Sequence, residues 1–176
     1  MKVALLVLLA LELAVCGCGN SNDSTSGGTT TTGNWEAQLT GGTEQASLLN
    51  FVTSFSVTNS GPLDITGISF LNTGACFANG VNGATVSGNA DFTTSSTNAV
   101  TGTMSLTITS TTSGSVLTMT GDLTGTSDAT STTTGTLSNG VVVGSWSLTP
   151  GSGAADCNTG SGSFTMCQNK ATCSTT

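Results

Sequence analysis

Residues 100–109, VTGTMSLTIT, alternate strictly between two kinds of side chain. Apolar residues such as Met104 and Ile108 share one parity with Gly102, and every residue of the other parity carries a hydroxyl group. Successive side chains of a β-strand point to opposite faces of the sheet, so the stretch predicts a strand with one buried face and one face in water. That division is typical of antiparallel sheets, because parallel sheets are usually covered on both faces.

The same period of two recurs along most of the chain, whereas no period of 3.6 persists for three helical turns. Turn-forming residues separate the alternating stretches at 59–62, 111–114, 138–140 and 150–153. Connections this short join neighbouring strands, so the sequence predicts an all-β antiparallel meander of eight or nine strands. The other alternating stretches are 34–39, 49–57, 84–93, 117–123, 142–148 and 162–166.

Glycines inside the predicted strands indicate how this sheet is closed. Gly88, Gly102, Gly121 and Gly144 all fall on the inward parity. A glycine within a strand marks a bend or a close approach of backbones, and repetition on successive strands allows a sheet to coil until it closes. We therefore expect an antiparallel up-and-down β-barrel, with a β-sandwich as the alternative. An outer-membrane barrel is not expected, because the chain has no Tyr for aromatic girdles.

The first 32 residues differ in composition from the rest of the chain. Lys2 precedes an apolar run, residues 3–11, that suits a secretory signal and is too short to cross a bilayer. Residues 20–32, NSNDSTSGGTTTT, contain no apolar side chain and predict a flexible tether.

Between these segments, residues 13–20 (LAVCGCGN) resemble the bacterial lipobox, in which a small residue precedes a Cys that is diacylated and becomes the mature N-terminus. Cys18 follows Gly17 and fits best; Cys16 is the alternative lipidation site. The resemblance implies a signal peptide at 1–17, a tether at 18–32, a β domain at 33–176 and attachment to membrane through acyl chains. Because Gly19 rather than Asp follows Cys18, it implies the outer membrane, on its periplasmic or outer face. An ordinary cleaved signal peptide is the other interpretation.

Gly33-Asn34-Trp35, at the head of the first predicted strand, resembles the Gly-X-Trp of lipocalins, where the Trp closes one end of an eight-stranded barrel. The resemblance implies a calycin-like barrel. The Arg that packs over this Trp in lipocalins has no counterpart, because the chain contains no Arg, and no ligand is carried over. Gly144-Ser145-Trp146 repeats the tripeptide, and a Trp that plugs the core explains both occurrences.

Charge composition excludes several classes of function. Nine acidic residues stand against Lys2 and Lys170, which gives a net charge of −7. So few cations cannot neutralise a row of phosphates, and nucleic acid is not an expected partner. Without His, Arg or Tyr the usual bases and oxyanion clamps are missing, so we predict no catalytic residue, no cofactor and no enzyme. Carboxylates such as Asp91 and Asp122 lie on the outward parity or near turns, where they are expected to be solvated.

Four cysteines follow the predicted anchor: Cys76, Cys157, Cys167 and Cys173. In an exported chain they predict two disulfides, with three possible connectivities. One of these joins Cys167 to Cys173 and Cys76 to Cys157. The absence of His and of CxxC spacing argues against zinc, and although Asp122, Asp128 and Asp156 lie near predicted loops, no calcium-binding motif is present, so no metal is expected.

Two functions remain compatible with the sequence. In the first, the anchored barrel binds a small apolar ligand without catalysis. In the second, the domain is a surface structural or interaction module that contacts glycans or other envelope components through its Thr/Ser face. If the barrel binds a ligand, the inward Gly and Ala residues leave a cavity. If the domain is a surface module, they let the backbones approach until the core is solid. The candidate ligand-lining residues are Phe51, Phe55, Phe92, Met104, Met119 and Trp146.

Overall fold

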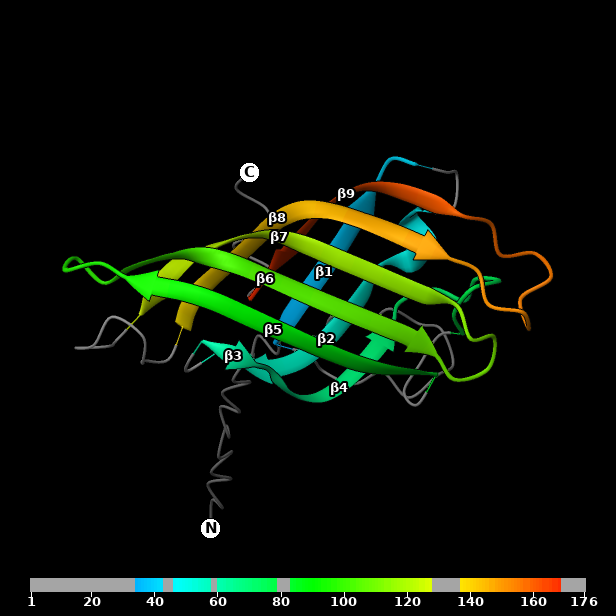
Figure 1. The fold of residues 1–176 in the computed structure, drawn as a ribbon, viewed down its shortest axis with the longest axis horizontal. Coiled ribbons are helices and arrows are strands. Elements are labelled where there is room, and N and C mark those ends of the chain that lie inside the picture. Colours follow the sequence, from blue (N-terminus) through cyan, green and yellow to red (C-terminus); the bar gives the residue numbers. More distant parts are fainter. Residues whose placement is uncertain (1–33, 43–45, 58–59, 79–82, 128–136, 169–176) are drawn as a thin grey trace, which may run out of the picture.

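The computed structural model describes residues 34–42, 46–57, 60–78, 83–127 and 137–168. These residues form one nine-stranded antiparallel sheet that curls into a nearly closed barrel (Figure 1). The strands β5 to β8 run side by side across the front, and β1, β2 and β4 cross behind them at a steep angle (Figure 1). The elements are β1 (Trp35–Thr40), the 3-10 helix η1 (Ala46–Leu49), β2 (Phe51–Ser56), β3 (Gly61–Pro62), β4 (Asp64–Phe70), β5 (Ala84–Thr94), β6 (Ala99–Ser110), β7 (Val116–Ser127), β8 (Leu137–Thr149) and β9 (Gly160–Cys167).

The order of the strands around the barrel follows their order in the chain. β5 to β9 pair consecutively, β9 then pairs with β1, β1 with β2, and β2 with β4. The first and last strands are thus neighbours, with Leu39 in register with Phe164. This arrangement confirms the predicted up-and-down meander, and the described strands belong to a single sheet rather than to the two sheets of a sandwich.

The two ends of this strand order meet between β4 and β5, where β3 bridges them. Gly61 and Pro62 of β3 pair with β5, whereas β4 pairs with β2 on the opposite edge. Leu63 lies between β3 and β4, and its N–H donates to the carbonyl of Gly88 in β5 at 2.9 Å. One extended segment therefore contacts both edges of the sheet. The predicted turn at 59–62 is wrong for Gly61 and Pro62, because a proline is tolerated in an edge strand, where its missing N–H disrupts no central ladder.

Two further sequence predictions need correction. Residues 138–140 were predicted as a turn, but they lie inside β8, where the β7–β8 register shifts between Thr124 and Thr126. Asn139 adopts a positive φ of 53°, so the Asn-Gly signal produces a bulge here instead of reversing the chain. Leu49 shares the parity of the strand that follows it, yet it ends the 3-10 helix η1, and β2 begins only at Phe51.

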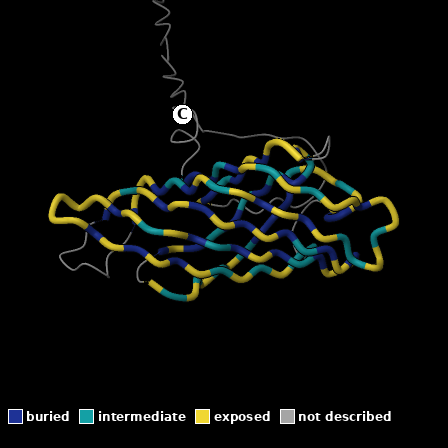
Figure 2. The backbone as a smooth tube through the Cα atoms, turned by 45° about the horizontal axis from the view of Figure 1, so that its top comes forward, coloured by how far each residue is buried: buried dark blue, intermediate teal, exposed yellow. Residues whose placement is uncertain are grey.

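The predicted alternation of burial is present along the long strands (Figure 2). On the inward parity, glycines lie where neighbouring backbones approach closely. Gly121 of β7 is in register with Gly144 of β8, and a Cβ added at Gly144 would overlap the carbonyl oxygen of Thr120. A Cβ at Gly102 would overlap the carbonyl oxygen of Asp91 in the same way. The inward glycines therefore permit the tight coiling that brings the sheet to near closure.

Large side chains cover other inward glycines. A Cβ at Gly140 would overlap the ring of Trp35, and one at Gly162 would lie 2.8 Å from Nε1 of Trp146. A glycine on one strand thus makes room for an indole from another. This complementarity fills space that the missing side chains would otherwise leave, as close packing of protein interiors requires.

Substitution of Gly144 tests the close approach of β7 and β8. We expect Gly144→Ala to lower the free energy of unfolding by about 2 kcal/mol or more, because backbone rather than a flexible side chain occupies the space. Gly74→Ala is the matched control: its Cβ would make ordinary contact with Leu48 at 3.4 Å, and its effect should stay within about 0.5 kcal/mol. Urea unfolding followed by circular dichroism measures both, and equal stability of the two variants would contradict the close approach.

Candidate functional site

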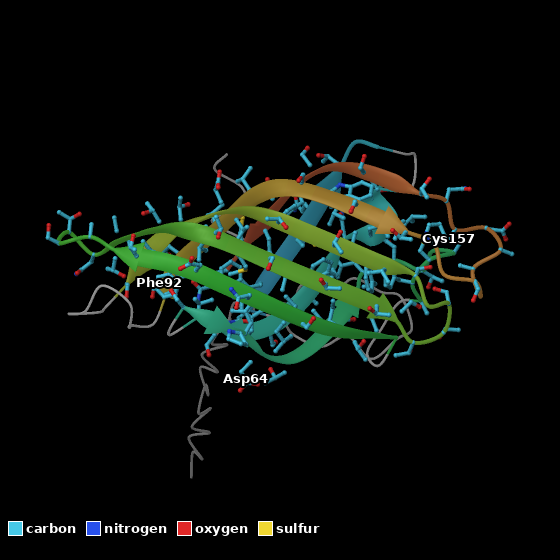
Figure 3. All side chains as sticks on the ribbon, in the orientation of Figure 1. Asp64, Phe92 and Cys157 are labelled. Atoms are coloured by element: carbon cyan, nitrogen blue, oxygen red, sulfur yellow. A yellow bond between two sulfur atoms is a disulfide. The ribbon has the colours of Figure 1, made fainter. Side chains whose placement is uncertain are left out.

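The six predicted lining residues all lie inside the barrel and are at most 3% exposed. Phe92 extends from β5 in this interior set (Figure 3). Phe55 stacks on Trp35 with ring centroids 4.9 Å apart, and Phe51 packs at a tilt on Phe70 at 5.7 Å. The structure thus brings the six residues together in one core cluster, which they share with aromatic rings that the sequence pattern did not select.

The indole N–H groups of the two tryptophans lie near opposite ends of β1, Trp35 as the first residue of that strand and Trp146 from β8. Trp35 begins the strand, and its Nε1 donates to the carbonyl of Phe55 at 3.3 Å. Nε1 of Trp146 donates to the carbonyl of Thr40, the last residue of the strand, at 3.2 Å. Each buried indole N–H therefore has a partner, and each ring packs as a core plug with its polar group satisfied.

Residues 71–78, which follow β4, pack against the core at one end of the barrel. Phe77 of this segment is 1% exposed and stacks on Phe70 at 4.4 Å. Cys76, the preceding residue, forms a disulfide with Cys157 in the β8–β9 connection, beyond the end of β8 (Figure 3). This is one of the pairings that the sequence allowed. Phe77 was missed because it lies outside any alternating stretch, so no periodic signal identified it as core.

Buried serines of the β6–β7 connection contact both cysteines of this disulfide. The Ser113 hydroxyl donates to the carbonyl of Cys76 at 2.8 Å and lies 2.8 Å from the Ser115 hydroxyl, which contacts Sγ of Cys157 at 3.5 Å. The N–H of Gly151 donates to the same Ser115 oxygen at 3.1 Å. These hydroxyls join three connections, and with no His in the chain they have no conventional base to activate them as nucleophiles.

The remaining cysteine predictions are only partly covered by the structure. Cys167, at the end of β9, is also disulfide-bonded. Cys16, Cys18 and Cys173 lie outside the described residues, as does Gly33 of the Gly-X-Trp tripeptide. The lipid anchor and the lipocalin resemblance therefore stay predictions.

The described carboxylates are dispersed rather than clustered. Asp91 and Asp122 are exposed on the outer face, Asp156 is exposed in the β8–β9 connection, and Asp128 lies outside the described residues. Within the described ranges, no group of three or more potential metal-ligating side chains comes together. The same ranges contain no helix of sufficient length and apolarity to cross a membrane.

Polar side chains, all of them hydroxyls except the amide of Asn89, form two rows across the outer face of the sheet. The pairing of consecutive strands places outward residues of β5 to β9 side by side. Neighbouring strands lie about 4.8 Å apart, so adjacent members of a row are within reach of one another or of a common ligand. One row consists of Ser87, Thr107, Thr118, Ser147 and Ser161, and the next of Asn89, Ser105, Thr120, Ser145 and Ser163.

A shallow depression of about 430 Å³ lies in this face over β7, β8 and β9. None of its lining residues carries a charge. The Thr118 and Ser147 hydroxyls are 2.7 Å apart and bond to each other, whereas within the described ranges those of Thr120, Ser145 and Ser161 have no protein partner. The period-two alternation predicts the Thr/Ser face but marks no position on it, because the alternation is uniform along each strand. The lining residues are Thr118, Thr120, Ser145, Trp146, Ser147, Ser161 and Gly162.

Comparison with known proteins found no matching family model, no similar curated protein and no similar solved structure.

Removal of the Cys76–Cys157 disulfide tests its contribution to closing the barrel end. The disulfide spans 81 residues, and the loop-entropy model predicts that Cys76→Ala/Cys157→Ala lowers the free energy of unfolding by about 4 kcal/mol. Asn158→Ala, an exposed position in the same connection, should change stability by less than about 0.5 kcal/mol. Guanidinium unfolding measures both variants. A loss below about 1 kcal/mol in the double variant would show that the end is held by packing alone.

Proposed function

We propose that this protein is a non-catalytic display module, held at the bacterial outer membrane by acyl chains on Cys18, whose β domain contacts an envelope partner through its outer hydroxyl face. The observation that carries the proposal is the contrast between the two faces of the sheet. The inward face carries an apolar core cluster, with buried hydroxyl residues such as Thr94, Ser110 and Ser127 at strand ends, and the outward face of β5 to β9 presents rows of mostly hydroxyl side chains.

Packing of the interior favours this function over binding of a small apolar ligand. The six candidate lining side chains contact a core in which Trp35 covers Gly140 and Trp146 covers Gly162. A ligand pocket of ordinary size has a volume of about 300–1,000 Å³ and is lined mainly by apolar groups. The depression described above has such a volume, but it lies on the outer face and is lined largely by hydroxyl groups, which suits a polar partner.

The exposed carboxylates support a non-catalytic role. Asp91 and Asp122 are both in register with Thr103 of the strand between them, so two strand spacings, about 10 Å, separate their backbones. A pair of carboxylates that hydrolyses a glycosidic bond needs one protonated acid, usually created by an apolar environment. Both aspartates are exposed on the outer face and neither lies in an apolar pocket.

The anchor rests on the lipobox resemblance and on the apolar-free segment at 20–32. Each acyl methylene buried in a bilayer contributes about 0.8 kcal/mol, so two or more chains hold a protein stably at the membrane. The 13 residues at 20–32, whose composition predicts a tether, would give the hydroxyl face access to other molecules of the envelope.

A Cys18→Ser variant tests the anchor. We expect the full chain, expressed in a two-membrane bacterium, to carry diacylglyceride on Cys18 and to sediment with membranes, because the acyl chains supply the attachment. Cys18→Ser should appear in the soluble fraction, whereas the control Cys16→Ser should remain in the membrane fraction. Intact mass spectrometry after detergent extraction measures the modification. Retention of Cys18→Ser in membranes would show that another group anchors the chain.

Dye uptake tests the choice between an internal and an external site. Because aromatic and aliphatic side chains pack the core, we expect no saturable fluorescence increase when an apolar dye is titrated to micromolar concentration with the full chain. The melting temperature should also be unchanged by the dye, since only a ligand that binds the folded state raises it. Saturable uptake with a raised melting temperature would instead support the ligand-binding function.

A further inference from the structure

We propose that the depression over β7, β8 and β9 is a binding subsite for a neutral polysaccharide, an inference that rests on the proposed function and specifies its partner. The site is built from three consecutive strands. Thr118 and Thr120 of β7 are in register with Ser147 and Ser145 of β8, and Ser147 is in register with Ser161 of β9.

The curvature of the barrel accounts for the depression. A closed, twisted sheet has the shape of a hyperboloid, which is convex around its circumference and concave along its axis. At Gly121 and Gly144 a Cβ on either strand would overlap the backbone of the other, and this glycine pair lies one inward position away from Trp146, which lines the depression. Short Ser and Thr side chains leave this concave strip open to solvent, where a longer residue would fill it.

The lining hydroxyls match a sugar polymer in hydrogen-bonding capacity. Each is both a donor and an acceptor, as is each hydroxyl of a sugar ring. Threonine is branched at Cβ and serine is short, so little side-chain freedom is lost when they bind. The Thr118–Ser147 bond fixes part of the lining before a ligand arrives, and the hydroxyls of Thr120, Ser145 and Ser161 remain available within the described ranges.

Val143 extends the site with an apolar contact. It is 50% exposed, the one large hydrophobic side chain among the described residues with that degree of exposure, and it lies two positions before Ser145 on the same face of β8. Sugar rings present C–H groups as well as hydroxyls, and Val143 together with the threonine methyl groups offers them an apolar surface.

Charge and side-chain composition argue against other partners. An anionic polymer requires cations, and the described residues contain none, since both lysines lie outside them. Protein interfaces are anchored mainly by Trp, Tyr and Arg. The chain has no Tyr or Arg, and both tryptophans are buried. A neutral, hydroxyl-rich chain is the partner whose chemistry the depression complements.

Polysaccharide binding by the immobilised full chain tests the proposal independently of membrane anchorage. Biolayer interferometry would use three soluble neutral probes (dextran, mannan and a β-1,3-glucan) and the anionic polymer alginate. We expect saturable binding to at least one neutral probe and none to alginate. Thr120→Val/Ser145→Ala should weaken that binding about tenfold, because it removes two free hydroxyls while keeping side chains that suit a strand.

Two controls separate loss of the site from loss of the fold. Thr101→Val removes an exposed hydroxyl of β6 outside the depression and should bind as the parent does. Thr120→Ser keeps the hydroxyl and removes only the methyl contact, so it should bind more tightly than Thr120→Val/Ser145→Ala. The inference is overturned by absence of binding to all three neutral probes, by equal weakening in Thr101→Val, or by association of the chain with itself in place of polysaccharide. None of these results bears on the membrane anchor, because lipidation of Cys18 is measured separately by mass spectrometry.

Discussion

The close approach of β7 and β8 at Gly121 and Gly144 is the constraint on which the rest of the structure depends. Two strands at this distance cannot both carry a Cβ toward the interior. The absence of side chains there lets the sheet coil, and coiling brings β9 against β1 and β4 near β5. These glycines matter for their small volume as well as for their conformational freedom, because the absence of a Cβ allows the sheet to coil tightly.

A small radius determines where a ligand can be held. Trp35 and Trp146 occupy space left open by Gly140 and Gly162, so inward glycines receive the largest side chains of the core. Packing of this kind favours the outer face of the sheet for the proposed site. There the same curvature produces a concave strip, and its hydroxyl lining follows from the period-two pattern that buries the apolar residues. The same period-two alternation therefore produces both features: residues of one parity form the core, and residues of the other parity line the candidate site.

Much of the fold can be predicted from the sequence, because it depends on local alternation that is regular over 84–93, 100–109 and 117–123. Prediction failed where the chain departs from that period. Gly61-Pro62 has the composition of a turn, but its role in bridging β5 and β4 depends on strands far away in the sequence. Asn139 has a positive φ, which is typical of a turn residue, but in this structure it forms part of a bulge within β8. The depression was not predictable at residue level, since it arises from curvature of the whole sheet and not from any motif.

The pairing of β1 with β9 has a consequence for the timing of folding. A chain is synthesised from its N-terminus, and β1 (Trp35–Thr40) cannot find its second neighbour until Gly160–Cys167 has been made. Contacts this distant in sequence carry a large loop-closure cost and form slowly. Until then the edge of β1 is open, and alternate residues along it are Glu36, Gln38 and Thr40. These polar side chains discourage unwanted edge pairing with other chains during the interval before the barrel closes.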